Sequence, residues 1–268
     1  MQKFFAGLMA AAMLLTSAGE TGQDVRDEAG GAEKTKHVLT AVFVQQQTAQ
    51  TAVENRTDVY TFEYDEYGRL LEADSQAYSY YERYTDPQFI YYVMIPGRDH
   101  YEYNDDGTVS KVTRMSYDEE PVVRFTVEYE YEDGKLAHEF YTNGDKLVIA
   151  DYIYDEDGVL SEVNREEGNG NENYVKLKYH GDGKVSSLRS KKVVNRSTFD
   201  ITSSVIYNAD NRISEIHAVS GNMMSENSHF TFRYEENGDL RDVGFVQGYF
   251  EIYYLMTFEY RDIPVKGE

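Results

Sequence analysis

The chain has 268 residues, with 26 basic and 48 acidic side chains and a formal net charge of −22. A surface this acidic repels nucleic acid and anionic membranes, so neither is an expected partner. The absence of cysteine excludes disulfides, thiol catalysis and thiolate metal sites. The 25 tyrosines, 13 phenylalanines and only four prolines are typical of a β-rich protein.

Residues 1–18 have the pattern of a secretory signal peptide. Lys3 supplies a positive start, an apolar run extends from Phe4 to Leu15, and small residues suited to cleavage follow up to Ala18. The run is too short for a transmembrane helix, and a buried helix is the alternative. The segment also resembles a lipoprotein cleavage box in which Ala18 stands where the lipidated cysteine belongs. We therefore expect export to the periplasm, the cell surface or the medium.

Residues 19–36 are polar, rich in glycine and without an apolar period. This composition predicts a disordered tether. Regular structure is expected to begin at His37, so that residues 37–268 form a single domain. On this interpretation residues 1–36 contribute nothing to the stability of the fold.

Seven copies of one motif occupy most of that domain. Each copy contains an aromatic residue, any residue, a tyrosine, two or three polar residues, a glycine or asparagine, and a short apolar run. The steps between the turn residues are 39, 27, 24, 25, 28 and 27 residues, the length of two strands and two turns, so each repeat is predicted to be a β-hairpin. The turn ends in a residue type that tolerates positive φ: Gly68, Gly107, Gly134, Gly158, Gly183, Asn211 and Gly238.

The strand before each turn alternates between apolar and polar residues, as residues 125–131 show. This period places an aromatic and β-branched face in the interior and a charged face in water. After the turn an apolar pair recurs at spacing three, for example Leu160 and Val163. Spacing three would put the pair on opposite faces of a flat strand, so a β-bulge is predicted just past each turn.

About sixteen extended segments can be read between the turns, and no segment has a helical period. A flat sheet of this size would leave unpaired edges. We therefore predict an all-β, antiparallel up-and-down meander in a closed or flattened barrel, with an open β-spiral as the alternative. The predicted segments are 37–47, 56–64, 69–83, 88–103, 108–118, 121–131, 134–142, 146–154, 159–166, 173–179, 184–194, 198–207, 212–220, 227–234, 239–247 and 249–261.

Alternation with an even strand number is also typical of outer-membrane barrels. Against this alternative, the apolar face is rich in tyrosine and residues 261–268 contain no terminal aromatic residue. The sequence therefore favours a barrel with its apolar face inside, and no membrane insertion is expected.

Residues 64–70, Tyr-Asp-Glu-Tyr-Gly-Arg-Leu, resemble the YD repeat of the rearrangement-hotspot and teneurin families. Similar units occur in uncharacterised bacterial surface lipoproteins whose fold is described as porin-like. The resemblance covers roughly residues 56–247, and most copies keep only the tyrosine, the acidic turn and the glycine. It implies a scaffold and transfers no catalytic residue.

No set of catalytic or metal-ligating residues stands out. The acidic turns lack the ligand spacing of an EF-hand, and no serine lies in a nucleophile elbow. We therefore expect no metal, no cofactor and a non-enzymatic binding or scaffold protein. A glycan-acting hydrolase with two carboxylates is the enzymatic alternative. The six histidines show no paired metal spacing: His37, His100, His138, His180, His217 and His229.

Two clusters of aromatic residues are candidates for binding a glycan or a peptide. One interrupts the repeat spacing, and the other lies near residue 250. When a segment carries aromatic side chains on both faces, one face packs against the protein and the other is left for a ligand to cover. Packing where the sheet closes is the alternative. The candidate residues are Tyr80, Tyr81, Tyr84, Tyr91, Tyr92, Tyr253 and Tyr254.

Overall fold

The computed structural model describes residues 34–48, 51–76, 97–117, 119–144, 146–166, 172–194, 197–220, 228–247 and 252–266. In these ranges all regular structure is β-strand, and no helix has the length and hydropathy to cross a membrane. The strands are β1 (Thr35–Thr48), β2 (Thr51–Tyr64), β3 (Leu70–Gln76), β4 (Gly97–Tyr103), β5 (Val109–Met115), β6 (Val123–Glu132), β7 (Lys135–Asn143), β8 (Lys146–Tyr154), β9 (Leu160–Glu166), β10 (Glu172–Tyr179), β11 (Val185–Val194), β12 (Ser197–Tyr207), β13 (Ile213–Ser220), β14 (Ser228–Tyr234), β15 (Leu240–Gln247) and β16 (Ile252–Pro264).

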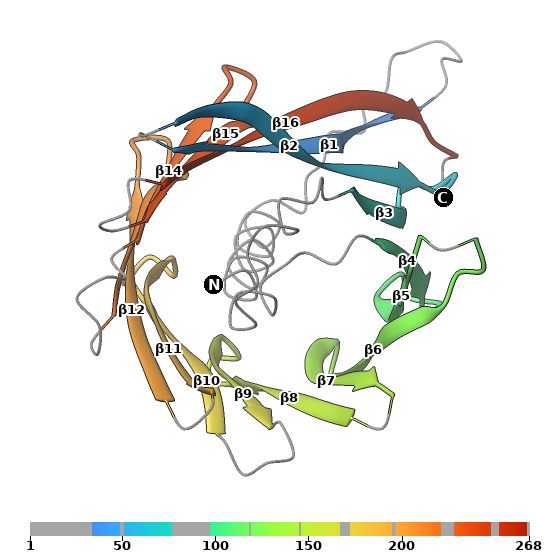
Figure 1. The fold of residues 1–268 in the computed structure, drawn as a ribbon. Coiled ribbons are helices and arrows are strands. Elements are labelled where there is room, and N and C mark those ends of the chain that lie inside the picture. Colours follow the sequence, from blue (N-terminus) through green and yellow to red (C-terminus); the bar gives the residue numbers. More distant parts are fainter. Residues whose placement is uncertain are drawn as a thin grey trace.

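The sixteen strands form one closed barrel in which every strand pairs antiparallel with its neighbours in sequence (Figure 1). The first and last strands complete the ring, with pairs running from Thr35 opposite Pro264 to Thr48 opposite Ile252. Closure removes both edges of the sheet, where unpaired backbone groups would otherwise remain. The predicted all-β barrel is confirmed, and the open spiral is wrong.

The seam between β1 and β16 extends beyond the predicted start of the domain. Strand β1 begins at Thr35, two residues before His37. The backbone N–H of Val265 donates to the carbonyl of Lys34, and the amine of Lys36 donates to the carbonyl of Gly68 at 2.8 Å. Pairing with β16 therefore brings residues 34–36 into regular contact with the barrel, so the sheet begins before the predicted boundary at His37.

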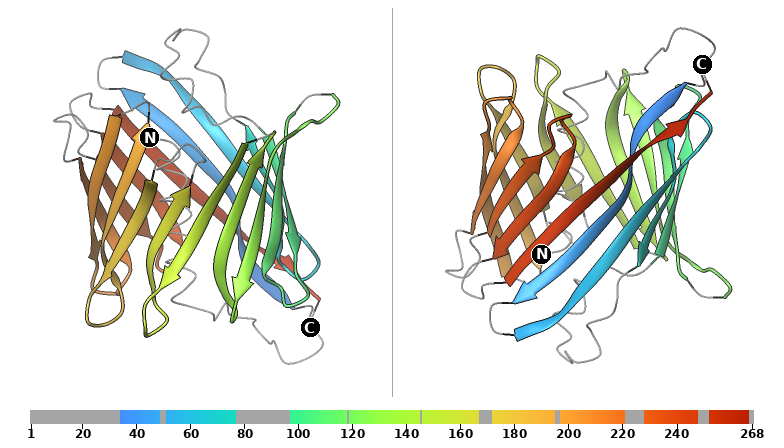
Figure 2. Two further views of the ribbon diagram at one scale, coloured as in Figure 1. Left: turned by 90° about the horizontal axis from the view of Figure 1, so that it is seen from below. Right: turned by 90° about the horizontal axis from the view of Figure 1, so that it is seen from above.

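The seven repeat turns connect even-numbered strands to the following odd-numbered strands at one end of the barrel (Figure 2). All seven turn residues singled out in the sequence have positive φ, with Asn211 at 64°. In the first turn Gly68 N–H donates to the Asp65 carbonyl, and one Asp65 carboxylate oxygen accepts the N–H groups of Tyr67 and Arg69. The acidic residue therefore closes the turn, and the glycine supplies the left-handed backbone that ends it.

A register shift follows every one of these turns. In the β8–β9 hairpin, for example, Ile153 pairs with Glu162 but Tyr154 pairs with Leu160, leaving Ser161 as the additional residue. The same shift occurs at the tyrosine of the other six repeats. The predicted bulges are thus present, and each places the residues at spacing three, such as Leu160 and Val163, on one face.

The repeated tyrosine joins neighbouring strands at the turn end of the barrel. One such tyrosine stands on each even-numbered strand from β2 to β14, and its hydroxyl donates to a backbone carbonyl on the preceding odd-numbered strand at 2.5–3.0 Å. This ring of bonds accounts for the tyrosine in the motif. The seven residues are Tyr64, Tyr103, Tyr131, Tyr154, Tyr179, Tyr207 and Tyr234. Tyr260 on β16 also has a backbone hydrogen bond, with Leu240 on β15.

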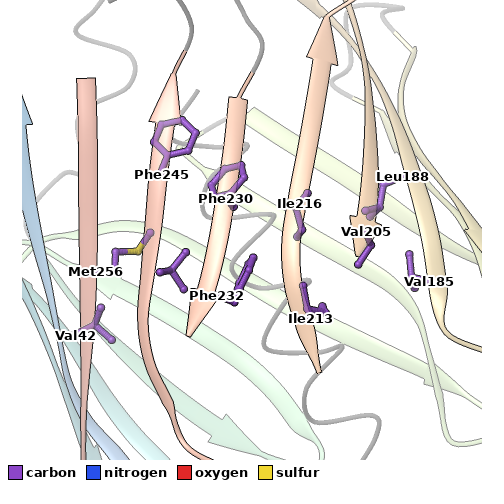
Figure 3. Close-up of a cluster of buried hydrophobic side chains, with 11 residues drawn as sticks. Val42, Val185, Leu188, Val205, Ile213, Ile216, Phe230, Phe232, Phe245 and Met256 are labelled. Atoms are coloured by element: carbon purple, nitrogen blue, oxygen red, sulfur yellow. The ribbon is translucent and has the colours of Figure 1, made fainter. Parts of the chain in front are cut away.

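One face of the wall is apolar and buried, most completely on β1 and from β11 to β16 (Figure 3). Val243, Met256 and Ile216 are at most 1% exposed. Side chains converge on the concave side of a closed wall and spread apart on its convex side, so this face lines the interior. The cluster consists of Val42, Val185, Leu188, Val205, Ile213, Ile216, Phe230, Phe232, Val243, Phe245 and Met256.

The convex face carries charged residues that pair across neighbouring strands. Lys176 on β10 lies 2.9 Å from Glu162 on β9, and Arg189 on β11 lies 2.7 Å from Asp200 on β12. These residues alternate with the buried apolar residues of the same strands. The sequence period of two therefore separates a water-compatible outer face from an apolar inner face.

Candidate functional site

The concave face is divided into two chemically different halves. On strands β12–β16 the described concave side chains are mostly apolar, and they include most of the buried cluster of Figure 3. On strands β4–β9 the same face carries two acids and two arginines among tyrosines and apolar residues. We call this second set the polar patch; it consists of Asp99, Tyr101, Arg114, Tyr129, Glu139, Tyr152 and Arg165.

The first part of the polar patch is an ion pair between β4 and β5. Asp99 and Arg114 are register partners, and the guanidinium donates through two nitrogens to both carboxylate oxygens. Their side chains are only 15% and 18% exposed. Arg114 also lies 5.6 Å from the centroid of the Phe125 ring. Both charges are thus neutralised within the patch, as partly buried charges require.

The second part of the polar patch centres on Glu139 of β7. The Tyr152 hydroxyl donates to one carboxylate oxygen at 3.0 Å, and an Arg165 nitrogen lies 3.8 Å from the other. Arg165 is less completely engaged than Arg114, because its side chain is 42% exposed. Its buried Nε has no hydrogen-bond partner within the described part of the chain. Arg165 therefore offers a cationic donor on the inner face.

The tyrosines of the polar patch stay protonated across the physiological pH range. Burial, with a smaller contribution from Asp99, raises the pKa of Tyr101 to about 12. Burial and then the Glu139 carboxylate raise the pKa of Tyr129 and Tyr152 well above the ordinary phenol value. The hydroxyls therefore serve as neutral hydrogen-bond donors and acceptors, and not as bases.

The aromatic candidates from the sequence do not coincide with this patch. Tyr80, Tyr81, Tyr84, Tyr91 and Tyr92 lie outside the described residues. Tyr253 and Tyr254 belong to β16 and pair with β1 and β15, and the structure describes only their backbone. The prediction of an aromatic ligand surface is thus neither supported nor contradicted.

Sequence reasoning missed the charged members of the patch, although a signal for them exists. Asp99 is in phase with Tyr101 and Tyr103, and Glu139 is in phase with Tyr141. A charge on the apolar phase of an amphipathic strand is uncommon, and it marks a buried or functional group. The many acidic residues on the other phase concealed these exceptions.

Comparison with known proteins supports the fold but does not indicate an activity. No protein-family model matches the chain, and no curated protein matches it. Among solved structures the chain is similar to a porin-like protein from Bacteroides uniformis ATCC 8492, with 13% identity, a TM-score of 0.51 and coverage of 83% of this chain and 98% of the other. It is also similar to a porin-like protein from Bacteroides vulgatus ATCC 8482, with 12% identity, a TM-score of 0.49 and coverage of 84% of this chain and 99% of the other. The similarity extends to the barrel architecture, while the YD-repeat resemblance has no matching family model.

Proposed function

We propose that the protein is an exported, non-enzymatic barrel that binds an amphipathic small molecule against its concave face. The observation that carries the proposal is the division of this face into an apolar half and a polar patch. An acyl chain or similar apolar body would lie against the apolar half, and a polar head would meet the tyrosines and Arg165. Barrels of sixteen strands are wider than the side chains of their own wall can fill, so the interior of such a barrel has the width to hold a small molecule.

Arg165 is the residue that best suits an acidic head group. Arg114 is saturated by Asp99, whereas Arg165 is partly exposed and keeps a donor without a partner among the described residues. A guanidinium binds carboxylate or phosphate oxygens in a fixed, paired geometry. We therefore assign the anionic head group of the ligand to Arg165.

The charged outer wall supports the interpretation that water, and not lipid, surrounds the barrel. Ion pairs such as Glu162–Lys176 lie on the central part of the outer face, where a membrane barrel carries an apolar band. Exposed large apolar residues on this face, such as Ile153 and Val219, are scattered among polar neighbours. Export is supported by the signal-peptide pattern of residues 1–18 and is compatible with the porin-like structural neighbours.

The enzymatic alternative has weaker support. A hydrolase of this kind needs an available acid and an available base about 5–10 Å apart. The two acids of the polar patch are already engaged, Asp99 by Arg114 and Glu139 by Tyr152. Their arrangement favours structural and binding roles.

Fluorescence titration of the full chain with a dansyl-labelled C11 fatty acid tests the proposal. We expect saturable binding of the probe, displacement by unlabelled palmitate, and weaker binding after Arg165→Gln. Arg189→Gln is the matched control, because Arg189 forms its ion pair on the outer face. Absence of saturable binding, or equal affinity in the Arg165→Gln and wild-type proteins, would contradict the proposal. Size-exclusion chromatography without detergent tests the water-exposed wall: recovery only in detergent would favour the outer-membrane alternative.

A further inference from the structure

We propose that Glu215, His217 and His229 form a zinc-binding site on the outer face of the barrel. This site is separate from the concave face and from the proposed ligand. It was not predicted from the sequence, where the histidines show no paired spacing. Strand pairing, and not sequence distance, brings these two histidines together.

The three residues are positioned by the register of β13 and β14. His217 and His229 are direct register partners, and Glu215 precedes His217 by two residues and so projects from the same face. The centroids of the two imidazole rings are 4.2 Å apart. Two paired strands therefore present three ligand side chains from one small area of rigid wall.

The ligand atoms converge on a single point. Nε2 of His217 lies 2.7 Å from Oε2 of Glu215, and Nε2 of His229 lies 3.2 Å from the same oxygen. All three ligand atoms lie within 4.8 Å of one another. Ligand atoms about 2.0–2.2 Å from a common Zn²⁺ are separated by distances of this order, so small side-chain rotations bring the three atoms to the ion.

Other histidine–carboxylate contacts in the described part of the chain lack this convergence. His37 contacts Asp262 through Nδ1 and Asp239 through Nε2, so its two partners lie on opposite sides of the ring. His138 has Asp151 as its carboxylate partner. Within the described ranges, the Glu215 group is the one with three metal-ligating side chains around one point.

The chemistry of the group favours zinc over calcium or magnesium. Two imidazole nitrogens and one carboxylate oxygen suit Zn²⁺, whereas calcium and magnesium prefer a set made of oxygens. Three protein ligands leave a coordination position for water, and side chains that are 40–45% exposed leave access to it.

The surroundings also favour a cation. The register partners of these residues on the same face are Ser204, Ile206, Thr231 and Val246, none of which is basic. The net charge of −22 attracts cations to the surface as a whole. No neighbouring lysine or arginine among these partners competes with the metal for the Glu215 carboxylate.

Competition of the full chain with a chromophoric zinc chelator tests the site. The protein must lack a polyhistidine tag and must first be stripped with a chelator. We expect one tightly bound Zn²⁺ ion per chain. His217→Asn, His229→Asn and Glu215→Gln should each lower the zinc affinity by more than about tenfold, because substitution even of a residue that only hydrogen-bonds to a metal ligand lowers metal affinity by that much. The control variants His37→Asn and His138→Asn should bind like the wild type.

The melting temperature provides a second measurement. Zn²⁺ should raise it in the wild type and in both controls but not in the three site variants, because only the folded state carries the site. The three changed side chains are partly exposed, so the melting temperatures of these variants without metal should stay close to that of the wild type. Sub-stoichiometric Zn²⁺ binding to the wild type, or unchanged affinity in both His217→Asn and His229→Asn, would overturn the proposal.

Discussion

Each position of the repeated motif has its own physical role. The tyrosine hydroxyl bonds to the preceding strand, the acid or amide caps the turn, and the glycine supplies positive φ. The residue after the glycine often contacts the next repeat: Lys135 donates to the Gly158 carbonyl at 2.9 Å and lies 5.1 Å from the Tyr154 ring centroid. The motif therefore encodes contacts between hairpins as well as the hairpin itself.

Alanine substitution at two turn glycines should separate backbone strain from contact with a neighbour. Gly107 (φ 84°) has no atom within 4 Å of an added Cβ, so Gly107→Ala should cost about 1–2 kcal/mol of strain alone. At Gly158 (φ 77°) the added Cβ would lie 2.2 Å from Lys135 Nζ and displace that amine. Chemical denaturation should therefore show a larger loss for Gly158→Ala than for Gly107→Ala. Equal losses would mean that the lysine contact contributes nothing.

Removal of one tyrosine hydroxyl should measure the bond between strands. Tyr234→Phe leaves the ring in place but removes the 2.9 Å hydrogen bond to the Ile213 carbonyl. We expect a loss of about 1–3 kcal/mol in the free energy of unfolding, because a partly buried carbonyl is left without its donor. Tyr117→Phe, at a residue that is 43% exposed, is the control. If both variants denature alike, the ring of tyrosine hydroxyls does not stabilise the barrel.

At the scale of elements, the sequence predicted the repeat strands well and the ends of the ring poorly. Alternation and turn residues identified sixteen segments, because both signals are local. The start of β1 was misplaced since residues 34–36 lack an alternating pattern, and their order depends on β16, more than 220 residues away. The pairing of His217 with His229 was missed for the same reason: register between strands is not visible in the spacing of one strand.

The seam between β1 and β16 can be tested by shortening the chain. A variant beginning at His37 lacks the Thr35 and Lys36 pairs with β16, the Lys36 bond to Gly68 and the Lys34 carbonyl that accepts from Val265. We expect it to melt several degrees below a variant beginning at Lys34, since each kcal/mol lost corresponds to about 2–4 °C in a domain of this size. Identical melting temperatures would restore the interpretation of residues 34–36 as a tether.

The same seam contains a pH-dependent contact. Hydrogen bonds to Asp262 and then to Asp239 raise the pKa of His37 above 6.5. The protonated histidine is therefore favoured in the folded state, and its contribution to stability is fully present below about pH 6.5 and lost as the pH rises through the raised value. The difference in melting temperature between wild type and His37→Asn should accordingly shrink between about pH 6 and 9. A difference that is constant or grows over this range would contradict the assignment.

At the scale of the whole molecule, alternation on sixteen strands gives a barrel with an apolar inside and a charged outside. The sequence contained this division, because a period of two assigns each residue to one face. It did not show that the inner face changes character around the ring, from the charged groups of β4–β9 to the mostly apolar side chains of β12–β16. That asymmetry arises only when distant hairpins are closed into one circle.

Labelling of single cysteines tests most directly which face of the wall is inside. The chain has no cysteine of its own, and Val127 and Glu128 are adjacent on β6, with Val127 only 7% exposed and Glu128 exposed. In buffer without detergent, the cysteine of Glu128→Cys should react with a charged maleimide as fast as it does when the same variant is unfolded in urea. Val127→Cys should react about tenfold or more slowly, because reaction there requires local opening. Rapid labelling of Val127→Cys together with protection of Glu128→Cys would show that the apolar face points outward and would contradict the proposed architecture.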